Sequence, residues 1–414
     1  MIARLVGSEM CIRDSSQVII MLHKVPVHKL GIGSIFSYGF LFYLFAPVKP
    51  YLSNFLETSE TSILIILTIN LLIQAAIMPI IGKYIDKFGG LKVMRIGFII
   101  GSIGICCLGL IELNYIYFQN FFWLSLCLIL ISTSLSMCGY ECSFSTVIQL
   151  DEKNSRKNIS IITFYGGIAS TITWLCIFPL IDIYNLLISC LIISSLLLIY
   201  SLIINYEIKN HTHLNIQKNK FKKFNFLKLD IKQRLIFLIL SISNFLNVLV
   251  FASLTLFWIN WFSEIYENPS LAIILASIYG PFQTIGRLIE MFFGSKFDAR
   301  ITGTIGCIIT AISLILVQFD NIYFSILSMI LFGMGHGVIT VTFGFVTNLY
   351  FDAKIYGQAK SLIASTSNIA MAIGPSLGSF LYFYSGYLMF TSMLVIKIIM
   401  TLMFALLIIF EPTN

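Results

Sequence analysis

The chain has 414 residues, of which 58% are hydrophobic and only 11% are charged. Soluble domains carry about 25% charged residues, so this composition excludes a soluble fold and indicates that lipid is the surrounding solvent. The net charge of +7 does not indicate nucleic-acid binding, because such binding needs a basic surface on a soluble fold.

The chain begins with a leader at 1–16 that resembles a translated cloning adaptor and lacks the apolar run of a signal peptide. We interpret this leader as an artefact and exclude it from the fold. Apolar runs of about 20 residues follow, each long enough to cross a hydrocarbon core of about 30 Å. They do not alternate in polarity, which predicts spanning helices and excludes spanning strands. The first six predicted spans lie at 30–48, 62–81, 93–111, 121–149, 159–181 and 184–205.

A polar segment at 207–233 contains seven lysines and no run of spanning length. It predicts a basic cytoplasmic linker that contacts anionic headgroups and separates two halves, at 17–206 and 234–414. The remaining predicted spans lie at 235–258, 270–294, 301–318, 322–350, 359–384 and 387–410. Six spans plus six predict an all-α membrane protein with twelve transmembrane helices in two pseudo-symmetric six-helix halves.

Basic residues concentrate in alternate loops, and one set of loops receives only Lys49. Because lysine and arginine near span ends set the orientation, this asymmetry predicts that both termini are cytoplasmic. The expected location is the cell inner membrane, with the chain crossing it many times. The basic residues assigned to inside loops are Lys83, Lys87, Lys92, Arg95, Lys153, Arg156, Lys157, Lys296, Arg300, Lys354 and Lys360.

The loop after the second predicted span reads Gly-Lys-Tyr-Ile-Asp-Lys-Phe-Gly-Gly-Leu-Lys over 82–92, and a shorter copy reads Gly-Ser-Lys-Phe-Asp over 294–298. The glycine lets two helices approach, and the aspartate can accept from a helix N-terminus or pair with an arginine. Copies at matching positions of two halves indicate a transporter built from repeats. The residues expected to control conformation are Gly82, Asp86, Lys87, Gly89, Lys92, Gly294 and Asp298.

The loop at 82–92 closely resembles the signature loop of the major facilitator superfamily. Stretches at 140–141, 166–174 and 280–290 resemble bacterial members of its monocarboxylate-porter-like branch, and the likeness covers nearly all of the chain after the leader. His336 and Phe343 depart from the small amide and the arginine that we expect at those positions. The resemblance implies a transporter, not an enzyme, that needs no cofactor, functions as a monomer and carries a small-molecule substrate.

Ionisable side chains inside predicted spans mark a candidate substrate site, because a charge at mid-membrane costs about 2.5 to 3.5 kcal/mol. Arg287 and Glu290 are three residues apart and share a helix face; they either brace the helix as a pair or face the pathway. We assign Arg287 to substrate recognition and Glu290 to proton coupling. Glu141 is the second proton candidate, or a neutral acid bonded to a neighbouring helix. The candidate substrate-binding residues are Arg287, Glu290, Glu141, His336, Tyr140, Gln283 and Trp174.

Cys138, Glu141 and Cys142 share one helical patch, which His336 could approach. This patch would suit arsenite or a soft metal, although two cysteines are too few for a closed metal site and are also ordinary packing residues, so we predict no metal site. His336 either lines the cavity or bonds across a helix interface. The sequence predicts a secondary active transporter of a small organic solute, preferably a carboxylate, with proton coupling as a hypothesis. Efflux of a toxic compound or metalloid and a non-transporting membrane receptor are the alternatives.

Overall fold

The computed structural model describes residues 25–113, 120–210 and 222–412. The predicted leader and residues 211–221 of the predicted linker lie outside these ranges. Within them, every regular element is a helix.

The first half contains six passages through the bundle, because its longest helix includes two of them. That helix turns at Asn185, which adopts a positive φ of 73°. The side-chain oxygen of Asn185 accepts a hydrogen bond from the backbone amide of Ile188. The elements are α2 (Val27–Tyr38), the π-helical turn η1 (Gly39–Tyr43), α3 (Phe45–Phe55), α4 (Glu60–Phe88), α5 (Gly90–Gly109), η2 (Leu110–Glu112), α6 (Phe121–Cys138), α7 (Tyr140–Leu150) and α8 (Ser155–Asn210).

The second half repeats this plan with two shorter helices near its start. Trp258, Trp261 and Phe262 on the first of these are buried in an aromatic and aliphatic core. The elements are η3 (Phe226–Lys228), α9 (Ile231–Thr255), α10 (Trp258–Tyr266), α11 (Pro269–Ser277), α12 (Tyr279–Phe293), η4 (Gly294–Lys296), α13 (Ala299–Leu316), α14 (Ile322–Tyr350), α15 (Tyr356–Tyr384), α16 (Gly386–Leu406) and η5 (Leu407–Ile409).

Among the described residues, eleven helical segments are long and apolar enough to cross a membrane. The twelfth passage is α15, which has 29 residues but contains many serines, threonines and amides. These polar residues are accommodated because α15 packs on α4 and lines a cavity instead of facing lipid alone. The predicted fold class, twelve helices in two halves, is confirmed.

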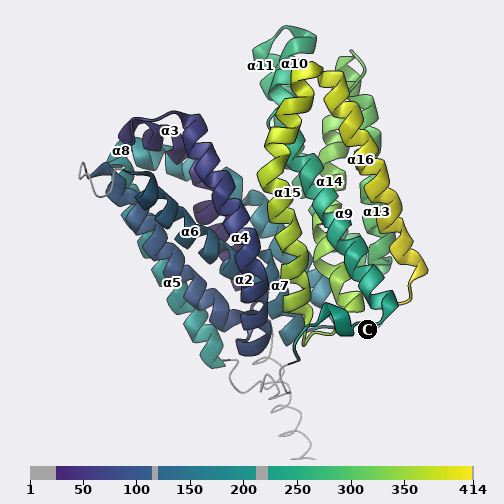
Figure 1. Cartoon of the computed structure of the whole chain (residues 1–414), viewed down its shortest axis with the longest axis horizontal. Helices are drawn as coiled ribbons and strands as arrows, with labels where there is room; N and C mark the ends of the chain where they lie inside the picture. Colours follow the sequence, from purple (N-terminus) through teal and green to yellow (C-terminus); the bar gives the residue numbers. More distant parts are fainter. Residues whose placement is uncertain (1–24, 114–119, 211–221, 413–414) are drawn as a thin grey trace, which may run out of the picture.

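The two halves converge at one end of the molecule and diverge toward the other (Figure 1). We call the converging end the linker end; it carries the junctions at 88–90, 151–154, 294–298 and 351–355. The diverging end, which carries α3, α10 and α11, is called the far end. Contacts of α4 with α15 and of α8 with α12 join the halves. The backbones of the two halves therefore lie farther apart at the far end than at the linker end.

Candidate functional site

A cavity of about 480 Å³ lies between the halves, and both halves contribute to its walls. Aromatic and aliphatic side chains cover most of its surface, with a few polar groups between them, as is typical of small-molecule sites. The polar lining residues are Tyr38, Tyr43, Gln74, Ser136, Tyr140, Glu141, Asn244, Asn247, Thr255, Gln283, Arg287, His336, Thr340, Lys360, Ser367 and Asn368.

Five of the seven sequence-predicted binding residues line this cavity: Tyr140, Glu141, Gln283, Arg287 and His336. His336 Nδ1 shares hydrogen bonds with the Tyr279 hydroxyl (2.5 Å) and with Gln283 Nε2 (3.4 Å). Both of these partners belong to α12, so His336 lines the cavity and also bridges two helices. Glu290 is not among the lining residues, and the side chain of Trp174, on α8, lies outside the described part of the structure.

The fourth predicted span is interrupted beside the cavity. We predicted one span at 121–149, but α6 ends at Cys138 and Gly139 adopts an extended conformation before α7 begins at Tyr140. The amide of Tyr140 donates to the Tyr38 hydroxyl (3.3 Å). The partly positive N-terminal end of α7 therefore lies at the cavity wall. Broken helices of this kind form substrate sites in transporters.

Arg287 is 6% exposed and reaches across to the first half. Its Nη1 donates to the carbonyl of Thr163 on α8 (2.7 Å), while its buried Nε has no hydrogen-bond partner among the described residues. Two consecutive glycines on α8 provide the room, since a Cβ on Gly166 would overlap the Tyr140 hydroxyl and one on Gly167 would overlap the Arg287 guanidinium. These glycines are therefore part of the site.

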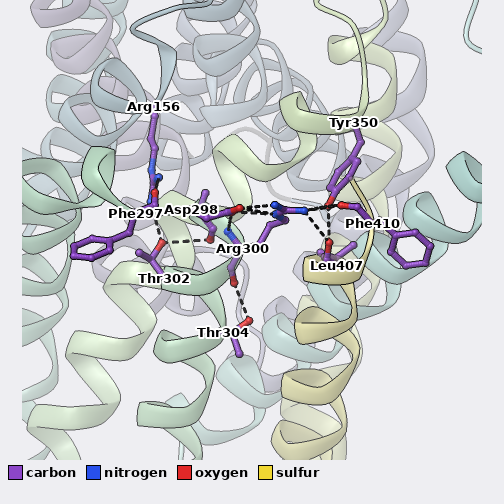
Figure 2. Close-up of polar contacts among 10 residues, drawn as sticks. Arg156, Phe297, Asp298, Arg300, Thr302, Thr304, Tyr350, Leu407 and Phe410 are labelled. Atoms are coloured by element: carbon purple, nitrogen blue, oxygen red, sulfur yellow. Dashed lines mark hydrogen bonds and ion pairs between the residues drawn. The ribbon is translucent and has the colours of Figure 1, made fainter. Parts of the chain in front are cut away.

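Glu290 is part of a contact between the halves, which we call the arginine latch. Arg156 on α8 donates to Glu290 Oε1 from Nη2 (2.6 Å) and from Nε (3.0 Å). Arg156 also donates to the Thr302 hydroxyl (2.9 Å) and to the carbonyl of Phe297, as Figure 2 shows. A pair between Glu290 and Arg287, one of the two alternatives that the sequence left open, is not present, because Glu290 bonds Arg156. Glu290 and Arg287 lie on one side of α12 because they are three residues apart, but their side chains contact different parts of α8.

Asp86 makes a second contact between the halves, the aspartate latch. Its carboxylate accepts from the amides of Gly357 (2.9 Å) and Gln358 (2.8 Å) and from Gln358 Nε2 (3.0 Å). The two amides belong to the first turn of α15, where the helix dipole favours a negative charge. Gly82 makes the approach possible, because a Cβ there would lie 2.6 Å from the carbonyl oxygen of Gly357.

The second copy of the loop behaves differently. Asp298 caps α13 by accepting from the amide of Arg300 (2.8 Å) and pairs with the Arg300 guanidinium, which lowers the pKa of this carboxyl. Arg300 also donates to the carbonyls of Leu407 (3.2 Å) and Phe410 (2.6 Å) (Figure 2). Asp298 thus anchors the C-terminal segment within its own half.

The other loop residues occupy the linker end. Gly89 joins α4 to α5 with a φ of 88°, a conformation that favours glycine. The Lys87 ammonium lies 5.0 Å from the centroid of the Phe88 ring, and Lys92 is exposed. Gly294 leaves space for the carboxylate of Glu290, which a Cβ there would overlap.

Sequence reasoning missed Lys360, which we placed in a loop. It lies inside α15, is 5% exposed, lines the cavity and donates to the carbonyl of Phe343 (3.0 Å). Asn244 and Asn247 on α9 also line the cavity. The sequence did contain a signal for these two residues, because two amide side chains three residues apart within an apolar run indicate a polar face on that helix.

The two cysteines of the patch, Cys138 and Cys142, are not among the cavity-lining residues, although Glu141 is. The Cys138 thiol donates to the carbonyl of Met94 (3.3 Å) and the Cys142 thiol to that of Gly90 (3.2 Å), both on α5. In the described ranges, no group of three or more His, Cys, Asp or Glu residues is placed to hold a metal ion. These thiols pack helices together, and nothing in their geometry favours a metalloid substrate.

Comparisons with known proteins agree with this architecture. Residues 31–139 and 240–414 match the family model described as Major Facilitator Superfamily. A search of curated proteins found no match.

Solved structures resemble this chain over nearly its whole length. The human organic anion transporter TETRAN is 11% identical, with a TM-score of 0.70, over 92% of this chain and 100% of that one. A proton:xylose symporter is 12% identical, with a TM-score of 0.70, and the match covers 93% of this chain and 96% of the symporter. A bacterial homologue of the iron transporter ferroportin, in an outward-facing state, is 14% identical with a TM-score of 0.71. That match covers 92% of this chain and 98% of the homologue. At these identities the likeness shows the fold.

Proposed function

Because the chain belongs to the Major Facilitator Superfamily, we propose that it moves a small organic anion across the membrane by alternating access of its two halves. Carboxylates are the preferred substrate class. The stretches resembling the monocarboxylate-porter-like branch support this class, and the same fold serves an organic anion transporter in TETRAN.

The charge of the cavity carries the proposal. Its charged lining residues are two cations, Arg287 and Lys360, and one carboxylate, Glu141. Glu290, which could have balanced the charge of Arg287, instead bonds Arg156. Burying a cation without a counter-charge is costly at membrane depth. An anionic substrate offsets that cost, and a guanidinium offers a carboxylate two parallel hydrogen bonds.

A counterflow assay in proteoliposomes tests the proposal with matched pairs of solutes. Lactate and succinate differ from lactamide and succinamide mainly in charge, so we expect exchange of the acids and little or no exchange of the amides. Equal exchange of acids and amides would overturn the anion assignment. If a solute binds in a thermal-shift assay but no solute is transported, the result would favour the non-transporting receptor.

The same vesicles test proton coupling when an inward proton gradient is imposed. Glu141 is the carboxylate on the cavity wall, and no hydrogen bond from a described residue to its carboxylate is present, so we assign it the proton. We expect the gradient to drive lactate accumulation in the native protein. Glu141→Gln should exchange lactate but not accumulate it; accumulation by this variant would remove Glu141 from coupling.

We place the linker end and both termini in the cytoplasm of a cell whose inner membrane holds the protein, on the strength of the lysines there. In a background in which the exposed Cys176 is replaced by serine, an impermeant thiol reagent should label a cysteine at Asn54 in intact cells. A cysteine at Lys228 should stay unlabelled until the cells are opened. The reverse pattern would invert the orientation.

A further inference from the structure

Lys397 is a second buried lysine in the second half, and it is not among the cavity-lining residues. It lies on α16, is 2% exposed and donates from Nζ to Asn247 Oδ1 on α9 (2.8 Å). Among the described residues it has no ion pair with a carboxylate. Its position was not recognised from the sequence, although a lysine in the middle of an apolar run of about 20 residues is rare in a membrane span.

The hydrogen bond fixes the orientation of the Asn247 side chain. A lysine ammonium can only donate, so the amide oxygen of Asn247 must be the atom that faces it. The NH₂ group must then point away from Lys397. Asn247 lines the cavity, and its NH₂ group donates to no described residue. Without Lys397, the Asn247 side chain could present either its oxygen or its NH₂ group to the cavity. With Lys397 bonded to the oxygen, the NH₂ group is the part that can donate to a ligand there.

We propose that Lys397 is a positioning residue that makes the cavity selective for anions through Asn247. An anion accepts from the NH₂ group, whereas a reversed amide would present its oxygen and repel the anion. The charge of Lys397 strengthens this effect, because a hydrogen bond from a cation polarises the amide and makes its NH₂ a better donor. This inference rests on the proposed transport of carboxylates and assigns Lys397 no contact with the substrate.

Two variants separate the donor from the charge. Lys397→Met removes both, whereas Lys397→Gln removes the charge but retains an NH₂ group that can donate to Asn247 Oδ1. With lactate as the probe, we expect Lys397→Met to raise KM about tenfold, which corresponds to the loss of one hydrogen bond of about 1.4 kcal/mol, with a small change in maximal rate. Lys397→Gln should recover part of that loss. Lys354→Met, at an exposed loop position, is the control and should match the native protein.

Asn247→Asp gives a test in a stable protein. The new carboxylate pairs with Lys397, so the melting temperature should be maintained or rise, while the NH₂ donor is lost and KM for lactate should increase as in Lys397→Met. If the native protein prefers lactate to lactamide while Lys397→Met and Asn247→Asp keep the native KM, Lys397 has only a structural role. If the native protein shows no preference for lactate, the proposed function fails instead.

Discussion

Replacing Arg287 by glutamine is expected to raise KM for lactate about 100-fold, because removing one partner of a buried, hydrogen-bonded charge pair costs about 2 to 5 kcal/mol. Arg287→Lys should have an intermediate effect, since it keeps the charge but loses the planar fork that matches a carboxylate. Uptake kinetics and melting temperatures measured on the same preparations separate loss of binding from loss of folding. Native KM in both variants would exclude Arg287 from the site.

The glycines on α8 give an independent test that leaves Arg287 unchanged. Gly167→Ala places a methyl group where the Arg287 guanidinium lies, so it should displace that side chain and raise KM for lactate. The helix itself should not weaken, since alanine is favoured over glycine in helices by about 1 kcal/mol. Gly280→Ala on α12 is the matched control, because a Cβ there has open space. Equal kinetics in the two variants would contradict the placement of Arg287.

Replacing Asp86 by asparagine is expected to lower the maximal transport rate at least tenfold with little change in protein abundance. The substitution retains size but removes the charge that the N-terminus of α15 stabilises, and charged hydrogen bonds contribute about 1.5 to 3 kcal/mol each. Distances between spin labels at Lys87 and Lys354 should increase as the linker end opens more often.

Asp298→Asn is the control for that experiment, because Asp298 occupies the equivalent loop position but, among the described residues, its hydrogen bonds and ion pair are with Arg300 of its own half. It should leave the label distances unchanged and lower the melting temperature through loss of the Arg300 anchor. Native transport by Asp86→Asn, or equal effects of the two variants on the label distances, would remove the aspartate latch from the mechanism.

Much of this architecture could be predicted because lipid makes strong demands on sequence. Continuous apolar runs gave the twelve passages, and a loop repeated at two positions indicated the two halves. The break at Gly139 could not be predicted, since glycines occur in many unbroken membrane helices and the partner that satisfies the free amide of Tyr140 is Tyr38, far away in the chain. Only folding brings such groups together.

The partners of buried charges were also beyond the reach of sequence reasoning. Residue spacing identifies the face that Glu290 and Arg287 share, but Arg156, which bonds Glu290, is 134 residues away. Lys360 was assigned to a loop because a lysine beside an apolar run usually marks the end of a span. It remains inside α15 because the carbonyl of Phe343 accepts from its ammonium group.

Both latches are at the linker end, and this placement makes the two faces of the membrane kinetically unequal. Apparent affinity is the intrinsic affinity multiplied by the fraction of molecules open to that face, so a fraction of about 1% weakens apparent binding about 100-fold. In the proposed cycle, solute arriving at the linker end must wait for both latches to release, whereas solute arriving at the far end need not. If the chain transports as proposed, we expect it to saturate at different concentrations on its two sides, although the latches cannot alter the final concentration ratio that a driving gradient sets.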